Sequence, residues 1–592
     1  MKKSLALILA VVMVLSLGLA ACGGEGGGDA TYKDTMTVSA GGYPDTIDPA
    51  LNSAVDGATY IIHAFAGLTG YNADCEIVAD CAKELPEAVA LDNGMVSYTY
   101  ELKDGLKWSD GSDLTAEDFV YAWNRAASPA TAADYCYMFE LIDGYAEMWK
   151  TDDEGNFVNP DAKLNVKSVN DGKALEVVVT VEVPYFHELC AFPAYMPVKA
   201  DVVDADPEGW ATKAASYIGN GPYKVTDFTQ AQLVMEKNEY YHNADAVKTK
   251  NIIWPFNEDD NALYANFQSG SYDFIDSVPN DQIDSIASRY ADEYKVTGQL
   301  GTYYVSFNVN DEALKDFTEA ERIDIRKALG LMLDRNYIVD AIGQAGQVPA
   351  NTFVAMGLTD ADGKTEFMDN ANGGNGYFSV KEEDYATNCQ TALTLLEGVA
   401  KSSGKFTVAD GTVTGFPVLT YLTNEGTGHE ALAAYMQDTL KGYGIEIKIE
   451  VQEWGTFLDT RKAGNYSIAR NGWLGDYNDP ISFLDMWISN SGNNDCQFGK
   501  GAHADYKGYS YDGKGDLTWA ESYDAIIAKV KGSKDAEERF ALMHQAEDLL
   551  MTTGAICPIY YYTDQFMISQ DIEGAFASPL GFKYFMYATI KA

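Results

Sequence analysis

Hydrophobic residues recur with two different periods along this chain, and each period predicts one kind of element. In the segment 443–453, YGIEIKIEVQE, every second residue from Ile445 to Val451 is apolar, which predicts a strand with one buried face. The segment 174–183, ALEVVVTVEV, is rich in β-branched residues and also predicts a strand.

Three other segments carry apolar residues at helical spacing. In 429–442, HEALAAYMQDTLKG, the residues Leu432, Tyr435, Met436 and Leu440 fall on one stripe of a predicted helix. The segments 321–342 and 538–551 show the same spacing and predict two more helices. The mixture of helices and strands throughout the chain indicates an α/β or α+β class.

The N-terminus predicts export from the cell. Residues 1–21 have a Lys-Lys head, an apolar run and small residues before Cys22, which is typical of a signal peptide with a bacterial lipobox. We therefore expect Cys22 to be lipidated and residues 22–34 to form a Gly-rich flexible tether. The alternative is an ordinary signal peptidase site with an incidental Cys. The prediction is a protein on the outer face of the cytoplasmic membrane, at a Gram-positive cell surface, or in the periplasm if the source is Gram-negative.

Length and charge limit the number of domains and the kinds of partner that the chain can have. A chain of 592 residues exceeds one ordinary core and suggests two or three domains. The 88 acidic residues against 42 Lys and Arg give a net charge of −46, which would repel phosphate backbones and argues against nucleic-acid binding. The same charge also fits plain solubility.

Short signatures of catalysis and metal binding are missing. The segment at 363–365, GKT, lacks the first Gly of a P-loop, and the chain has no HExxH, GxSxG or CxxC sequence. We expect no cofactor, no metal and no enzymatic activity, although a triad of distant residues stays possible. Apart from Cys22, the cysteines form an odd, scattered set, in which Cys75 and Cys81 could close a small loop or remain free thiols.

Several blocks resemble one family. They are LKDGLKWSDGSDLTAEDFVYAWNRAASPATAADY (102–135), GNGPYKV (219–225), GTYYVSFNVN (301–310), IDIRKALGLMLDRNYIV (323–339), EWGTFLDTRKAGNYSIARNGWLGDYNDPISFLDMW (453–487) and PIYYYT (558–563). Together they are similar to the family 5 solute-binding proteins, the oligopeptide-binding lipoproteins of ABC importers. The GWxxDYxDP block leans towards oligopeptides within that family.

The resemblance implies an α/β fold of the type II periplasmic-binding-protein kind, in its large three-domain form with two lobes. A discontinuous domain of the first lobe would comprise residues 35–58, 185–300 and 563–592, with residues 59–184 inserted into it. Residues 301–562 would form the second lobe. Chain crossings near Gly301 and Tyr562 would form the hinge.

The resemblance also implies a site. Asp476 would meet the α-ammonium group of a peptide; the alternative is a turn or cap residue, a role that Asp479 before Pro480 suits better. Asn471, Gly472, Trp473 and Leu474 on one side, and Ser53, Ala54 and Val55 on the other, would offer main-chain groups, which makes binding indifferent to peptide sequence. Gly472 is also compatible with an ordinary strand position.

Other positions would line side-chain pockets or hold the peptide's C-terminal carboxylate. They are Trp454, Arg461, Arg470 and His429, with Tyr135, Tyr303, Tyr304, Asn493 and Tyr562 as further wall candidates. The alternatives are a core Trp454, a surface-paired Arg461, a structural His429 and tyrosines that merely pack. Ser306 and Leu474 depart from residues that some peptide binders have there, so side-chain preferences are not carried over.

The predicted function is therefore capture of oligopeptides by a monomeric receptor that delivers them to the permease subunits of an ABC transporter and their ATPases. Rival solutes within the family are dipeptides, a nickel chelate or a signalling peptide. Rival classes are a secreted hydrolase and an adhesive surface protein.

Overall fold

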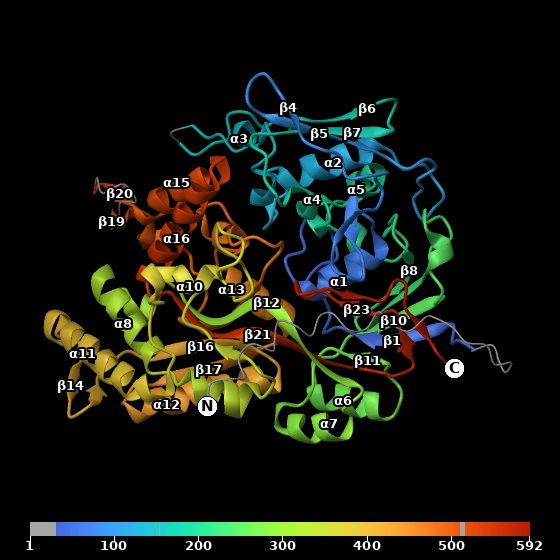
Figure 1. The fold of residues 1–592 in the computed structure, drawn as a ribbon. Coiled ribbons are helices and arrows are strands. Elements are labelled where there is room, and N and C mark those ends of the chain that lie inside the picture. The colour runs from blue at the N-terminus through green and yellow to red at the C-terminus, as the bar shows by residue number, and fades with distance from the viewer. Residues whose placement is uncertain (1–30, 153, 510–514) are drawn as a thin grey trace.

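The structure is a computed structural model that describes residues 31–152, 154–509 and 515–592. It is a mixed α/β protein of two lobes, as predicted, with segments distant in sequence side by side in each lobe (Figure 1). The predicted signal peptide, Cys22 and most of the predicted tether lie outside the described residues. Within the described ranges, no helix combines the length and the apolar character that a membrane span requires.

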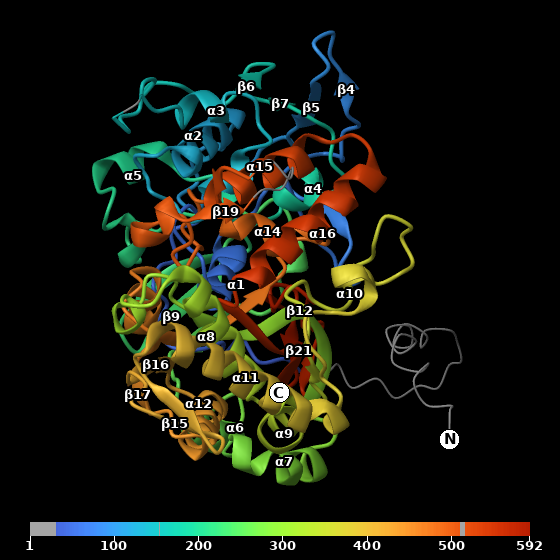
Figure 2. The same ribbon diagram turned by 90° about the vertical axis from the view of Figure 1, so that its left-hand side faces the viewer.

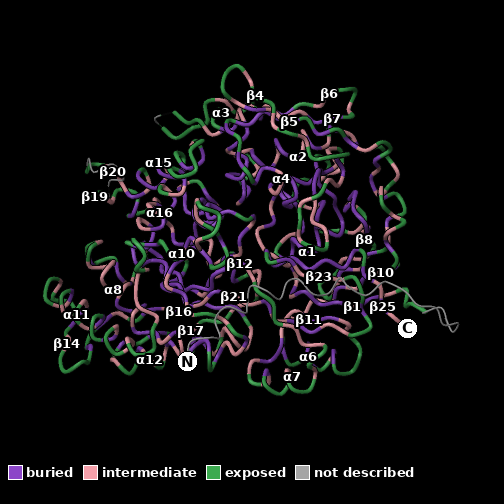
Figure 3. Tube along the Cα trace, viewed as in Figure 1, coloured by how far each residue is buried: buried purple, intermediate pink, exposed green. Residues whose placement is uncertain are grey.

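One sheet of eleven strands runs through both lobes. Its first-lobe strands are β1 (Thr35–Ser39), β8 (Tyr223–Phe228), β9 (Gln232–Lys237), β10 (Asn251–Pro255) and β11 (Phe274–Ile275). Its second-lobe strands are β16 (Leu419–Asn424), β17 (Ile447–Gln452) and β18 (Ile468–Leu474). Two long antiparallel strands, β12 (Tyr294–Phe307) and β21 (Ile556–Ile568), lie between these sets, and the short β13 (Val348–Pro349) pairs with β21. Figure 3 shows buried residues along the sheet and exposed residues on the outer loops.

The pair β12–β21 is where the lobes join. Its register shifts between Gly298 and Thr302, and β12 pairs with β18 only from Gly301 onwards. Such an irregularity bends a strand and increases its twist. The sheet narrows to β12 and β21 alone at residues 296–298 and 563–565, next to the predicted hinge near Gly301 and Tyr562, and the hinge itself stays a prediction.

A separate antiparallel sheet lies at the top of Figure 1, within the segment predicted to be inserted. Its strands are β4 (Val89–Ala90), β5 (Val96–Glu101), β7 (Ala174–Val179) and β6 (Val166–Val169), in that order. Helix α2 (Ala116–Ala127) packs against it and begins where Asp118 accepts a hydrogen bond of 2.8 Å from the Thr115 N–H. The strand predicted at 174–183 is confirmed as β7, which is shorter than predicted.

The second lobe carries long helices on two sides of the central strands. Helices α15 (Trp519–Gly532) and α16 (Ala536–Thr552) lie above β12 and β21 in both ribbon views (Figure 2). Helices α8 (Glu319–Leu331), α11 (Tyr385–Ser403) and α12 (Thr427–Gly442) complete the lobe. The helices predicted at 429–442 and 538–551 are confirmed as α12 and α16. The strand predicted at 443–453 is confirmed as β17, although its Val451 is 42% exposed.

The single helix predicted over 321–342 is wrong. Helix α8 ends at Leu331, and a short helix, α9 (Arg335–Tyr337), and a π-helical turn (Ile338–Gly343) follow. The cause is local, because the Asp334 side chain accepts hydrogen bonds from the N–H groups of Asn336 and Tyr337 and so starts a new helix. The apolar positions of the pattern remain buried, which is why the periodicity resembled one helix.

The seven cysteines of the described residues are free thiols. Cys75 is half-buried and Cys81 is buried, so of the two alternatives for this pair the structure has free thiols.

Candidate functional site

A cavity of about 500 Å³ lies between the lobes. Every predicted site residue except Tyr303 and Tyr304 lines it: Ser53, Ala54, Val55, Tyr135, His429, Trp454, Arg461, Arg470, Asn471, Gly472, Trp473, Leu474, Asp476, Asn493 and Tyr562. This volume is in the range of specific ligand pockets.

The second-lobe wall of the cavity contains an unpaired strand edge. Strand β18 pairs with β12 on one side over its whole length, but with β16 on the other side only at Ile468 and Ala469. Among the described residues, the edge from Arg470 to Leu474 therefore has no strand partner. The Gly472 N–H donates 2.8 Å to the Asn471 side-chain oxygen, so it lies on this edge and not in the β12 ladder. An extended ligand could take the place of this local bond.

Asp476 follows directly after this strand. Its backbone N–H donates 2.7 Å to Ser482 Oγ, and its Oδ1 accepts 3.0 Å from the hydroxyl of Tyr135. No Lys, Arg or His of the described ranges forms an ion pair with this carboxylate. Burial raises the pKa of Asp476 well above its usual range, the Tyr135 bond opposes that shift, and the charge of Asp485 adds to it. The site therefore favours a bound cation, which would restore the charged form of Asp476.

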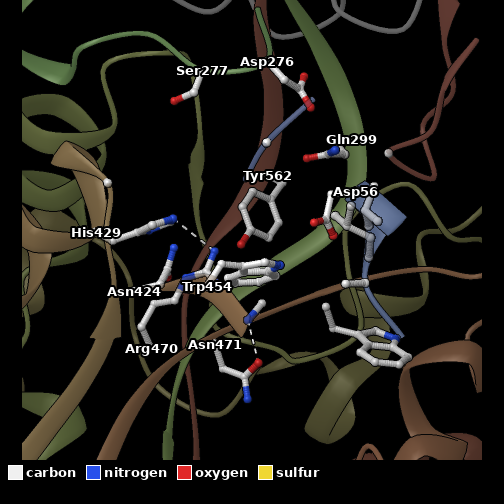
Figure 4. Close-up of a pocket in the computed structure, with 18 of the residues that line it drawn as sticks. Asp56, Asp276, Ser277, Gln299, Asn424, His429, Trp454, Arg470, Asn471 and Tyr562 are labelled. Carbon is white, nitrogen blue, oxygen red and sulfur yellow. Dashed lines mark hydrogen bonds between the residues drawn. The ribbon is translucent and has the colours of Figure 1, made fainter. Parts of the chain in front are cut away.

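Arg470 is a half-buried cation that lacks a carboxylate partner in the described part of the chain. Its guanidinium donates 3.1 Å to His429 Nε2 and lies 5.5 Å from the centre of the Tyr303 ring and 5.6 Å from that of Trp454. Its Nε atom is buried without a hydrogen-bond partner. Figure 4 shows His429 and Arg470 joined at the edge of the cavity. The group is suited to receive an anion.

His429 orients this cation and does not add a second positive charge. Burial and the neighbouring Arg470 lower the pKa of His429 well below its usual range, so the imidazole is neutral. Its Nε2 accepts from Arg470, which leaves Nδ1–H to face the Tyr303 hydroxyl at 3.3 Å.

Arg461 differs from Arg470, although both line the cavity. Its Nε lies 2.7 Å from Asp495 Oδ2, and both side chains are largely buried. The alternative of a surface-paired Arg461 is thus wrong about the surface and right about the pairing. Because Asp495 neutralises Arg461, Arg470 is the better anion site of the two.

The opposite wall comes from the first lobe. Ser53 and Ala54 precede α1 (Val55–Ala64), where Ala54 has extended backbone angles. Lys462, at the end of α13 (Trp454–Lys462), reaches across and donates 2.9 Å to Ser53 Oγ and 2.8 Å to Asp134 Oδ2. These contacts and the Tyr135–Asp476 bond join the two lobes around the cavity.

Two predicted wall residues do not line the cavity. Tyr304 packs edge-on against Phe353 and Trp487 in the core, because neighbouring residues of a strand face opposite sides. Tyr303 lies behind the wall, with its ring stacked on Tyr560. Tyr304 as a wall residue is therefore wrong, and Tyr303 lies behind the cavity in contact with His429 and Arg470, which line it.

The remaining predicted residues surround the strand edge. A Cβ built on Gly472 would lie 2.2 Å from the Tyr562 hydroxyl, so this Gly is required by a close approach and is not an ordinary strand position. Trp473 is buried and donates its indole N–H to the Ser482 carbonyl at 2.7 Å. Asn493 Nδ2 donates 3.4 Å to the Tyr137 hydroxyl.

Asp479 has a second role that its local sequence did not predict. Its Oδ1 accepts 3.1 Å from the Ile481 N–H, which agrees with the predicted capping role. Its carboxylate also forms a bidentate ion pair with Arg539, at 2.8 and 2.7 Å. This engagement leaves Asp476 as the acid of the motif that faces the cavity.

Sequence reasoning missed several acidic residues of the cavity, among them Asp56, Glu258 and Asp276. Asp56 directly follows the predicted Ser53-Ala54-Val55 segment, a position that could have drawn attention to it. The described residues contain no group of three His, Cys, Asp or Glu side chains arranged to hold a metal ion.

Comparison with known proteins decides the family. Residues 83–495 match the model of the bacterial extracellular solute-binding proteins, family 5 Middle. The chain belongs to this family. This chain is 30% identical to the oligopeptide-binding protein OppA of Bacillus subtilis over 600 aligned residues, which cover 99% of each chain. It is 29% identical to the dipeptide-binding protein DppE of the same species, over 91% of this chain and 89% of that one.

Solved structures agree on the fold. The crystal structure of Haemophilus influenzae OppA in complex with the peptide RPPGFSPFR matches the family 5 protein with a TM-score of 0.78 at 24% identity. The match covers 95% of this chain and 100% of the other. The resemblance inferred from the sequence blocks and the two-lobed fold are thereby confirmed.

Proposed function

We propose that this protein captures oligopeptides in the cavity between its lobes and delivers them to an ABC importer. The observation that carries the proposal is the unpaired edge of β18, which runs from Arg470, a cation without a carboxylate partner, towards Asp476, a carboxyl group without a cation partner. A peptide in zwitterionic form has the complementary ends, with main-chain groups between them. Family membership and the names of its relatives support the same reading.

Binding would use the mechanics of strand addition. The peptide's main chain pairs with β18 on one side and meets the Ser53-Ala54-Val55 segment on the other. Each main-chain hydrogen bond contributes about 0.5–1.5 kcal/mol net, so several are needed for useful affinity. Because these bonds do not read side chains, one site accepts many sequences.

The length of the edge favours oligopeptides over dipeptides. Arg470 to Leu474 spans about 13 Å at about 3.3 Å per residue. A peptide of about four residues covers that span, whereas a dipeptide reaches only one of the two charged ends. Dipeptide binding is the second candidate, because a dipeptide-binding protein is 29% identical to this chain.

The cellular context follows from the N-terminal sequence. Cys22 would carry the lipid, and the Gly-rich tether would hold the receptor at the outer face of the cytoplasmic membrane. Closure around a peptide would create the surface that the permease recognises. The protein would act as a monomer and return the peptide unchanged, without catalysis.

Titration calorimetry with alanine peptides of two to six residues tests the proposal. We expect tight binding from about four residues onwards, weak or no binding of the dipeptide, and intact peptide on recovery. Tightest binding of the dipeptide would favour the second candidate. Cleaved peptide, or no binding at any length, would contradict the proposal.

A further inference from the structure

The carboxylates of Asp56 and Glu258 on the cavity wall lack a cation partner, as Asp476 does. Both oxygens of Asp56 are buried and make only weak contacts with the Gly57 amide and the Trp454 side chain, and Glu258 Oε2 is buried without a hydrogen-bond partner. Neither side chain forms an ion pair with a described residue. By contrast, Asp495 pairs with Arg461 at 2.7 Å and Asp564 pairs with Lys583 at 3.0 Å, so these two acids of the cavity are neutralised.

Helix capping does not account for Asp56. It lies in the first turn of α1, where an acidic side chain commonly caps the helix, but the start of α1 has no side-chain cap hydrogen bond. Burial raises the pKa of Asp56 to about 6, although the Gly57 amide and Trp454 nearby oppose the shift. A buried carboxylate without a partner carries an unpaid desolvation cost.

Glu258 occupies the same wall. A Cβ built on Gly42 would lie 2.1 Å from Glu258 Oε1, and one on Gly41 would lie 3.6 Å from Asp56 Cβ. Gly42 therefore lets the Glu258 carboxylate approach the backbone next to Gly41, which lies beside the Cβ of Asp56. Burial and the negative charges of Glu453 and Glu425 raise the pKa of Glu258 to about 7.

The second lobe completes the enclosure. In Figure 4 the Asp56 carboxylate points into the space bounded by Tyr562 and the indole of Trp454. Two carboxylates beside an aromatic wall are the combination that binds an ammonium or guanidinium group, through charge-assisted hydrogen bonds and contact with the ring.

We propose that Asp56, Glu258 and Trp454 form a subsite for the side chain of a Lys or Arg residue in the bound peptide. The proposal rests on the proposed function and adds a preference to it. Main-chain pairing admits many sequences, and this subsite favours those with a cationic side chain at one interior position. The cation would pair with these carboxylates, which closure of the lobes would otherwise bury without a positive partner.

Tetraalanine with single replacements tests the subsite. Each position in turn carries Lys or norleucine, which has a similar length but no charge, and calorimetry gives both dissociation constants. At one interior position we expect Lys to bind at least about tenfold more tightly than norleucine. D56N and E258Q should each reduce that ratio at least about threefold without weakening the norleucine peptide, whose binding also shows that the variant is folded.

E208Q is the matched control. Glu208 is exposed and does not line the cavity, so the variant removes one negative charge without touching the subsite. The Lys to norleucine ratio should change less than about twofold. Two results would overturn the subsite: a Lys to norleucine ratio near one at every position, or an unchanged ratio in both D56N and E258Q. Either result would leave the proposed capture of peptides intact. If no tetrapeptide binds, subsite and proposed function are both overturned.

Discussion

The hydroxyl of Tyr135 donates a hydrogen bond of 3.0 Å to Asp476 Oδ1, from the first lobe to the second and across 341 residues of sequence. This bond fixes one carboxylate oxygen and leaves the other for a ligand. Because the bond joins the two lobes, separation of the lobes would break it. Tyr135 would then couple closure of the cavity to the orientation of the acid that would hold a peptide's N-terminus.

Tyr135→Phe should weaken binding of free-amine peptides about tenfold, because a hydrogen bond to a charged group contributes about 1.5–3 kcal/mol. The ring and its packing are retained, so the thermal stability of the free protein should stay nearly unchanged. Calorimetry with tetraalanine measures the effect. Unchanged affinity would show that this contact does not support the liganded state.

The two arginines of the cavity should respond differently to substitution. Arg470→Met should weaken the binding of peptides with a free C-terminal carboxylate by about 2–5 kcal/mol. The binding of peptides with a C-terminal amide should weaken much less, because the amide lacks the charge that Arg470 would meet. Arg461→Met is the control, since Arg461 already pairs with Asp495 at 2.7 Å. It should lower thermal stability and leave the ratio between acid and amide unchanged. If Arg461→Met changed this ratio and Arg470→Met did not, Arg461 would be the residue that meets the peptide's carboxylate.

Gly472→Ala should weaken all peptides, because the new Cβ would lie 2.2 Å from the Tyr562 hydroxyl and displace the wall. We expect a loss of about tenfold or more, from about 1–3 kcal/mol of steric strain. The double variant Gly472→Ala with Tyr562→Phe removes the clashing hydroxyl and should recover part of the affinity. Full affinity in the single variant would mean that the edge tolerates a side chain.

Binding of free-amine peptides should have an optimum in pH. On the alkaline side, affinity falls about tenfold per pH unit above the α-amino pKa of about 8, because the ammonium is lost. On the acid side, affinity falls as Asp476 of the free protein gains a proton. Burial raises the pKa of this group, so the loss should begin well above pH 4. Dissociation constants measured from pH 4 to 10 test both limbs, and Asp476→Asn should flatten them.

The sequence predicted those parts of the site that lie within one continuous motif. Asn471, Gly472, Trp473, Leu474 and Asp476 follow one another, so a family block places them together on one strand edge. Partners from distant segments were not predictable in this way. The pairing of Arg461 with Asp495 depends on how α13 packs, and no local pattern distinguishes Arg461 from Arg470.

The secondary structure was likewise predictable where the signal is local and not where it depends on distant contacts. Apolar periodicity predicted α12, α16 and β17, and a run of β-branched residues predicted β7, which is buried on both faces. It failed at Asp334, where a side-chain cap divides one apolar stripe between two helices. The family resemblance placed Tyr304 on the cavity wall, although only the pairing of β12 with β18 and β21 decides which face of that strand meets the cavity.

The central claim is that Asp476 holds the positive end of the ligand. The most direct measurement is the affinity of tetraalanine and N-acetyl-tetraalanine for the unaltered protein and for Asp476→Asn, which keeps the shape and the acceptor for Tyr135. The account predicts that the free-amine peptide loses about 2–5 kcal/mol in the variant while the acetylated peptide changes little. Equal losses for both peptides would contradict it.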